Sequence, residues 1–142
     1  MSQSTTQIAL YVGAILSFVA ALLHFSCMFI GAPAFRFLGA GEALARMSEE
    51  GHWYPSVVAF VIGAVLVGWA AYALSGAGVY HLPFTQYALA AIAVIYLARA
   101  VAFPFLKPVF PENSQLFWLV SSGICLIMGF AYLIGALGVW EK

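Results

Sequence analysis

The sequence has 142 residues, of which 65% are hydrophobic and only 7% are charged, and its mean hydropathy is +1.03. An ordinary soluble domain is about half apolar and about one quarter charged, so this composition excludes a water-soluble protein of the usual kind. Five basic and five acidic residues balance each other, which leaves no net positive charge to attract nucleic acid. The length indicates one domain, residues 1–142, and the composition places it in a lipid bilayer.

Four apolar stretches are each long enough to cross a hydrocarbon core of about 30 Å. They cover residues 8–30, 55–74, 84–105 and 117–137. Lipid offers no hydrogen-bond partner to the backbone, and none of these stretches alternates polar and apolar residues as a β-barrel strand does. The sequence therefore predicts an all-α fold, an integral membrane four-helix bundle.

The connection between the first two spans predicts an amphipathic helix over residues 34–50 that lies in the membrane interface. Glu42 and Arg46 stand at i, i+4 in the order that favours an ion pair on a helix. Gly39 and Gly41 weaken the helix, and an irregular loop is the alternative. Apolar residues recur on one side of this helix and charged residues on the other: Phe37, Ala40, Leu44 and Met47 against Glu42, Arg46, Glu49 and Glu50.

The basic residues that flank the spans predict how the chain is oriented in the membrane. Arg36, Arg46 and Lys107 lie in the first and third connections, whereas the opposite side carries only Lys142. The first and third connections are therefore expected in the cytoplasm, with both termini outside it.

Small residues follow one side of three of the spans at helical spacing. Because lipid tails are as apolar as the side chains, helices in a membrane associate through close packing and polar contacts, so these stripes mark the packed faces. Close approach of the backbones explains them without a ligand. The stripes are Gly13, Ser17, Ala20, His24, Cys27 and Gly31; Ser56, Ala59, Gly63 and Ala70; and Ser122, Cys125, Gly129 and Ala136.

Two ionisable residues, His24 and Arg99, lie inside the spans, where such groups are costly and mark candidate functional sites. From their positions along two parallel spans, both are expected about 10 Å inside the cytoplasmic boundary. A guanidinium at this depth needs a carboxylate, hydroxyls and carbonyls, or an anionic ligand. We therefore predict a polar pocket that opens to the cytoplasmic leaflet. The candidate ligand-binding residues are His24, Arg99, Ser121, Ser122, Tyr96 and Glu42.

Both intramembrane residues also have explanations that need no ligand. The Arg99 side chain can extend to the lipid headgroups, and His24 can make a hydrogen bond between helices.

Other chemistries find little support in the sequence. No Asp or Glu lies inside a span, which argues against proton-coupled transport through a membrane carboxylate. His52 and His81 fall on opposite sides of the bilayer, so a bis-histidine haem is not expected. His24, Cys27 and Cys125 supply too few ligands for a metal ion, and no catalytic motif is present. No catalytic residue or cofactor is assigned, and the sequence favours a non-enzymatic role over an enzymatic one.

In layout, with one span, an amphipathic segment and three closely connected spans, the chain resembles the small DoxX-like bacterial membrane proteins. The stretch from Gly31 to Glu42, GAPAFRFLGAGE, resembles uncharacterised proteobacterial inner-membrane proteins. The resemblance covers the whole chain in outline and implies a bacterial inner membrane. DoxX-like members often carry an acidic residue early in the second span, where this chain has Val58, Ala59 and Phe60, so no functional residue is carried over.

The preferred hypothesis is a binding or transport module that holds a small anionic or amphiphilic molecule between His24, Arg99 and Ser122. One alternative is an accessory subunit that docks on a larger membrane complex, and another is a membrane redox enzyme that acts on quinone or lipid. The expected partners are the lipid bilayer, a lipid or anionic small molecule, and a second copy or a larger membrane complex, with no nucleic acid.

Overall fold

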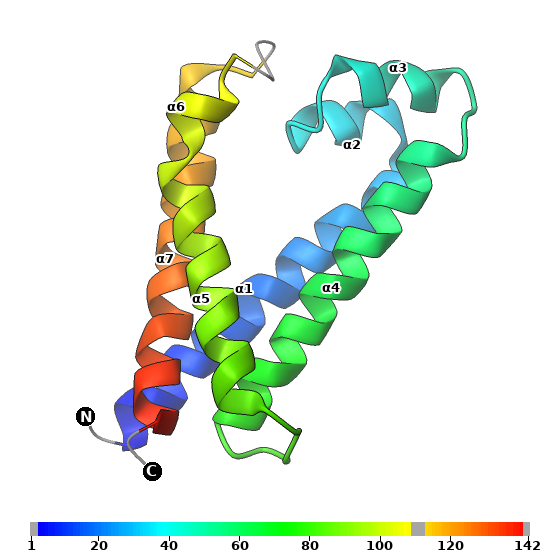
Figure 1. Cartoon of the computed structure of the whole chain (residues 1–142). Coiled ribbons are helices and arrows are strands. Elements are labelled where there is room, and N and C mark those ends of the chain that lie inside the picture. Colours follow the sequence, from blue (N-terminus) through cyan, green and yellow to red (C-terminus); the bar gives the residue numbers. More distant parts are fainter. Residues whose placement is uncertain (1–2, 109–112, 141–142) are drawn as a thin grey trace.

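The computed structural model describes residues 3–108 and 113–140, and within these ranges the chain forms α-helices and no strand (Figure 1). The all-α fold predicted from the sequence is therefore confirmed. The helices are α1 (Gln3–Ile30), α2 (Ala32–Phe37), α3 (Glu42–Glu49), α4 (Tyr54–Gly76), α5 (Thr85–Val101), α6 (Phe103–Leu106) and α7 (Gln115–Trp140).

Three of the described helices, α1, α4 and α7, are long and apolar enough to cross a membrane. They contain 28, 23 and 26 residues, and each spans at least the stretch expected from the sequence. The fourth apolar helix, α5, is shorter, with 17 residues. Length and composition thus make the chain compatible with a location inside a membrane.

The third apolar stretch, expected as one helix over 84–105, is divided in the structure. Helix α5 ends at Val101, and Pro104 lies at the first turn of the separate helix α6. A proline inside a continuous helix would remove one backbone hydrogen bond and clash with the carbonyl of Ala100 one turn earlier. The chain avoids this cost by ending α5 and starting a new turn.

The prediction of a single helix over residues 34–50 is wrong, because two short helices, α2 and α3, take its place. The backbone between them passes through Gly39 with φ of +75° and Gly41 with φ of +101°, which a right-handed helix cannot contain. Phe35 and Ala45 are buried where the two short helices pack against the end of α1 and the start of α4.

The long helices form two pairs. Helix α1 packs along α4, α5 packs along α7, and α1 also contacts α7. Figure 1 shows the pairs meeting at the end where α1 begins and α7 ends, and diverging toward the end that holds α2, α3 and α6. The main core fills the crossing, where Leu10, Leu89 and Tyr132 are fully buried.

Small residues let the helices approach each other at this crossing. A Cβ atom at Gly13 would lie 2.9 Å from the ring of Tyr132, and one at Gly135 would overlap the side chain of Leu10. The small-residue stripes expected from the sequence therefore do lie on packed faces. Their buried members are Gly13, Ser17 and Cys27 on α1, Ala59, Gly63 and Ala70 on α4, and Ser122, Gly129 and Ala136 on α7.

At the wide end of the molecule, where α2, α3 and α6 lie, contacts between described residues join the two pairs. Gly39, in the turn after α2, lies against the ring of Phe117 on α7, where a Cβ atom would overlap the ring. The Asn113 side chain donates from Nδ2 to the Gly39 carbonyl over 3.2 Å. These contacts fix the α2–α3 turn to the first turn of α7.

Candidate functional site

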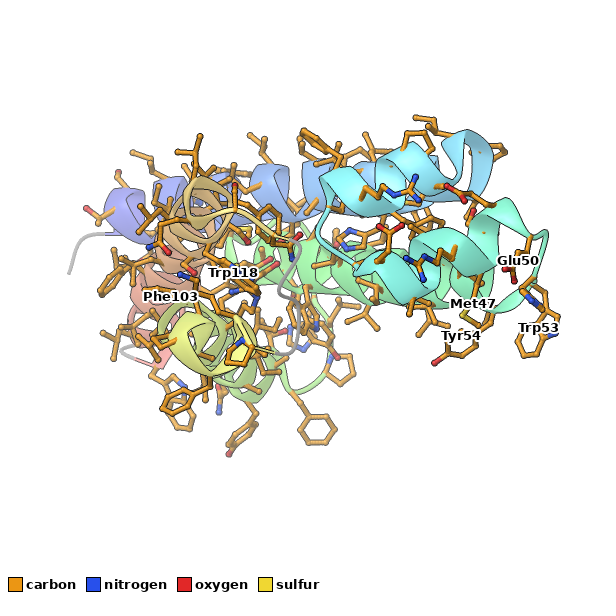
Figure 2. All side chains as sticks on the ribbon, turned by 90° about the horizontal axis from the view of Figure 1, so that it is seen from above. Met47, Glu50, Trp53, Tyr54, Phe103 and Trp118 are labelled. Atoms are coloured by element: carbon orange, nitrogen blue, oxygen red, sulfur yellow. The ribbon has the colours of Figure 1, made fainter. Side chains whose placement is uncertain are left out.

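Arg99 lies in the last turn of α5 and points its guanidinium at α7. Its Nη2 donates a hydrogen bond to Ser121 Oγ at 2.9 Å. The guanidinium carbon lies 5.4 Å from the centre of the Trp118 ring, a distance at which the cation is attracted to the ring face. Figure 2 shows Trp118 on the α5–α7 side of the molecule, well away from Trp53 and Tyr54 at the far end of α3.

Two buried polar atoms, one on Arg99 itself and one on the residue after Ser121, have no hydrogen-bond partner among the described residues. They are Nη1 of Arg99 and Oγ of Ser122, and Ser122 is only 8% exposed. A buried unpaired polar group costs about 1–3 kcal/mol, and a charged one costs more. The Arg99 guanidinium and the Ser122 hydroxyl therefore each keep a buried donor that no described residue satisfies.

His24, which the sequence placed beside Arg99, is bonded within its own helix. Its Nδ1 lies 2.7 Å from the carbonyl oxygen of Ala20. A carbonyl can only accept, so the ring hydrogen of a neutral His24 is on Nδ1 and Nε2 carries the lone pair. His24 is half-buried on α1, and no contact joins it to Arg99 among the described residues.

Tyr96 lies one turn before Arg99 on α5, but its hydroxyl points at a different partner. It lies 2.9 Å from Ser17 Oγ on α1, and its ring packs edge-on against Trp69 of α4 at 5.1 Å. Tyr96 thus belongs to the packed crossing of the helices rather than to the surroundings of Arg99.

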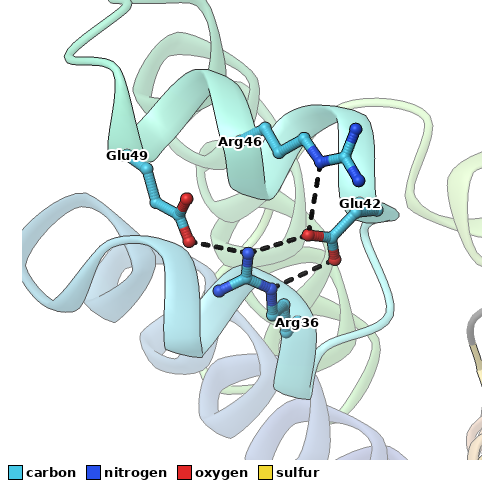
Figure 3. A network of polar contacts seen from close by, with 4 residues as sticks. All are labelled: Arg36, Glu42, Arg46 and Glu49. Atoms are coloured by element: carbon cyan, nitrogen blue, oxygen red, sulfur yellow. Dashed lines mark hydrogen bonds and ion pairs between the residues drawn. The ribbon is translucent and has the colours of Figure 1, made fainter.

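Glu42 belongs to an exposed ion-pair network on α2 and α3, which Figure 3 shows. Arg36 donates to both of its carboxylate oxygens, at 2.8 and 3.1 Å, and also lies 2.6 Å from a carboxylate oxygen of Glu49. The expected pair with Arg46 is present at 3.6 Å. The Arg36 hydrogen bonds lower the pKa of Glu42, and the two carboxylates raise the pKa of Arg36. The carboxylate of Glu42 is therefore engaged by arginines other than Arg99.

Of the six candidate residues, the structure brings Arg99 and Ser121 into contact, and Ser122 is the next residue along α7. The structure also places Trp118 against the Arg99 guanidinium, and Trp118 was not among the candidate residues expected from the sequence. Trp118 lies three and four residues before the two serines, so helical spacing was a signal that could have placed it on their face of α7.

The residues considered for metal binding are not gathered into a site. In the described parts of the chain, no three His, Cys, Asp or Glu side chains lie close enough to hold one ion. Cys27 donates to the carbonyl of Leu23 in its own helix at 3.5 Å, and both cysteines are free thiols.

A second feature, a pocket of about 380 Å³, lies at the opposite end, between the end of α4 and the start of α5. Ser75 Oγ accepts from Leu82 N at 3.0 Å and lies 2.8 Å from Thr85 Oγ1, which donates to the Leu82 carbonyl at 2.7 Å. These polar groups are hydrogen-bonded to each other, whereas Arg99 Nη1 is buried without a partner among the described residues. The pocket is therefore the weaker candidate for a polar ligand.

Comparison of the chain with protein families, with curated proteins and with solved structures finds no match. The resemblance to DoxX-like proteins stays a prediction.

Proposed function

We propose that this chain is a multi-pass membrane protein that binds a small anionic or amphiphilic molecule at Arg99. The observation that carries the proposal is the pair of buried donors without a partner, Arg99 Nη1 and Ser122 Oγ. An anionic oxygen bound to both would remove the cost of leaving them unpaired, and hydrogen bonds to charged groups contribute about 1.5–3 kcal/mol each.

The proposed membrane arrangement has four spans, with α5 as the fourth. Seventeen residues rise about 25 Å along a helix, and α5 packs along the longer α7. Exposed aromatic residues flank the apolar lengths, as expected for rings at the membrane–water interface. They are Trp53 and Tyr54 at one end and Tyr80, Phe84, Tyr87 and Trp140 at the other.

The proposed location is a bacterial inner membrane with both termini outside the cytoplasm. Helix α2, helix α3 and helix α6 lie at the same end of the molecule (Figure 1). This end carries Arg36, Arg46 and Lys107, which supports a cytoplasmic orientation for it.

An apolar tail on the ligand is supported by the surface next to the site. Ile95 and Leu119 are exposed, and they lie one helical turn before Arg99 and Ser122, on the same helix faces. A molecule whose anionic group reaches Arg99 from the bilayer would lay its hydrocarbon part against such side chains. Amphiphiles therefore fit the site better than small water-soluble anions.

The test compares two arginine variants of the purified protein in mild neutral detergent. Arg99→Gln removes the charge at the site, whereas Arg46→Gln removes an equal charge from an exposed residue at the same end. Mass spectrometry of the intact protein then measures the amount of co-purified anionic lipid or fatty acid. We expect a loss of roughly tenfold or more in the Arg99 variant alone.

Three controls keep this result interpretable. Helicity and thermal unfolding show whether Arg99→Gln still folds, and Ser122→Ala provides a milder change that should weaken retention several-fold. Equal retention in all variants would contradict the proposal. A stoichiometric protein partner in place of a bound lipid would support the accessory-subunit alternative, and a bound quinone would support the redox alternative.

A further inference from the structure

The site around Arg99 carries a single positive charge. The described basic residues are Arg36, Arg46, Arg99 and Lys107. Arg36 and Arg46 bind the carboxylates of the α2–α3 network, and Lys107 Nζ donates to Gln115 Oε1 at the start of α7. Ser122 lies seven residues further along α7 than Gln115, which is about 10 Å of helix rise.

We infer that the ligand is a singly charged amphiphile, a carboxylate or phosphodiester on a hydrocarbon chain. This inference rests on the proposed function and adds the charge of its ligand. A buried charge is tolerated when it is paired, and a buried excess charge is costly. One guanidinium neutralises one negative charge. A phosphate monoester carries close to two charges at neutral pH, so it would bring an uncompensated charge into the membrane.

The unpaired donors match the headgroup of such a ligand. Arg99 uses Nη2 on Ser121, which leaves the N–H groups of Nη1 and the O–H of Ser122 unpaired. A carboxylate and a phosphodiester each present two equivalent acceptor oxygens. One oxygen accepts from Nη1 of Arg99 and the other from Ser122.

The other groups near Arg99 do not change this charge count. Helix α1 contacts α5 through Ser17 and Tyr96, and the other elements packed against α5 are α4, α6 and α7. The titratable side chains of these last three are the phenols of Tyr54, Tyr72 and Tyr132 and the thiol of Cys125. Phenols and thiols do not become cations at any pH. His24, on α1, donates to Ala20 in its own helix.

The test measures equilibrium binding of three radiolabelled ligands with matched hydrocarbon chains, in neutral detergent. The ligands are a fatty carboxylate, a phosphodiester lipid and an alkyl phosphate monoester. Binding is measured at pH of about 8 and about 5.5, on either side of the second pKa of the monoester at about 6. The phosphodiester stays singly charged throughout and therefore reports any titration of the protein itself.

We expect the carboxylate or the phosphodiester to bind roughly tenfold more tightly than the monoester at the higher pH. The monoester should bind more tightly as the pH falls, because it becomes singly charged, while phosphodiester binding stays constant. Whichever singly charged ligand binds more tightly identifies the natural headgroup.

A monoester that binds more tightly at the higher pH would overturn the single-charge inference and leave binding at Arg99 intact. If none of the three ligands loses affinity in Arg99→Gln relative to Arg46→Gln, the proposed function itself fails. The two failures are therefore distinguishable in one data set.

Discussion

The hydroxyl of Ser17 on α1 lies 2.9 Å from the hydroxyl of Tyr132 on α7, and both residues are fully buried. Tyr132 donates its only hydroxyl hydrogen to the carbonyl of Trp69 on α4 at 3.0 Å. It must therefore accept from Ser17, and Tyr96 on α5 must donate to Ser17. One directed chain of hydrogen bonds thus joins α1, α4, α5 and α7 where they cross.

Replacing Tyr132 with Phe should destabilise the fold by about 1–2 kcal/mol, because it leaves the Ser17 hydroxyl and the Trp69 carbonyl without their partner. Unfolding in mixed micelles with increasing SDS measures this change. Tyr11→Phe is the matched control, since Tyr11 is 42% exposed on the same fold, and we expect it to change stability by less than about 0.5 kcal/mol. Equal effects of the two variants would contradict the proposed importance of the chain.

Two glycines of α7 should respond in opposite ways to the same substitution. A Cβ atom at Gly135 would overlap Leu10, whereas one at Gly123 would have no atom within 4 Å. We expect Gly135→Ala to destabilise the fold by about 1–3 kcal/mol through overpacking. Gly123→Ala should be neutral or stabilise by up to about 1 kcal/mol, because Ala loses less backbone entropy in a helix. The same SDS titration compares them, and a destabilising Gly123→Ala would argue against this packing.

Replacing Gly39 should destabilise the fold by more than backbone strain alone would, because the new Cβ atom would also overlap Phe117. Gly39 and Gly51 both have positive φ, +75° and +80°, but only at Gly39 would a Cβ atom meet another side chain. Gly51→Ala should cost about 1–2 kcal/mol for the left-handed backbone, and Gly39→Ala should cost clearly more. Hydrogen exchange at the first turn of α7 should increase in Gly39→Ala alone. An unchanged exchange rate there would contradict a fixed junction between α2–α3 and α7.

The α2–α3 network should weaken in acid. The Arg36 hydrogen bonds lower the pKa of Glu42 in the folded chain, so its stabilising effect is present above the unfolded pKa and is lost as the pH falls through the lower, folded value. We therefore expect amide protection in α3 to be constant near neutral pH and to decrease below pH of about 4.

Hydrogen exchange of the α3 amides as a function of pH measures this loss. Glu42→Gln should show the weaker protection already at neutral pH, without the transition in acid. Glu50→Gln is the control, because Glu50 is exposed and pairs only with His52 among its described contacts. A transition that persists in Glu42→Gln would assign the pH dependence to another group.

The sequence predicted the helices well and their interruptions less well. Apolar runs without polar breaks predicted α1, α4 and α7, because each backbone group in lipid must find its partner within the helix. The third stretch was expected to continue through Pro104 to residue 105, whereas the structure ends α5 at Val101. Gly39 and Gly41 were recognised as weak points, yet a single helix was expected where the structure has two.

The candidate site was predicted in part. The sequence indicated Arg99, Ser121 and Ser122 because ionisable and polar side chains are costly inside an apolar span and therefore mark candidate sites. The partners of His24 and Tyr96 were not predictable, since depth in the membrane says which residues share a level but not which way each helix is rotated. For Glu42, the sequence predicted the pair with Arg46 but not the pair with Arg36. Arg36 lies six positions before Glu42, and only the turn at Gly39–Gly41 brings them face to face.

The sequence by itself determined that the long apolar segments suit a lipid bilayer better than water. Apolar composition and span length are properties of each segment alone. The sequence also determined which helix faces pack, since small residues at helical spacing mark them wherever the partner lies. Only the tertiary structure decided that Arg99 contacts Trp118 and Ser121 while His24 bonds to Ala20 in its own helix. Such contacts depend on the crossing and rotation of whole helices, which follow from the summed packing of many distant residues.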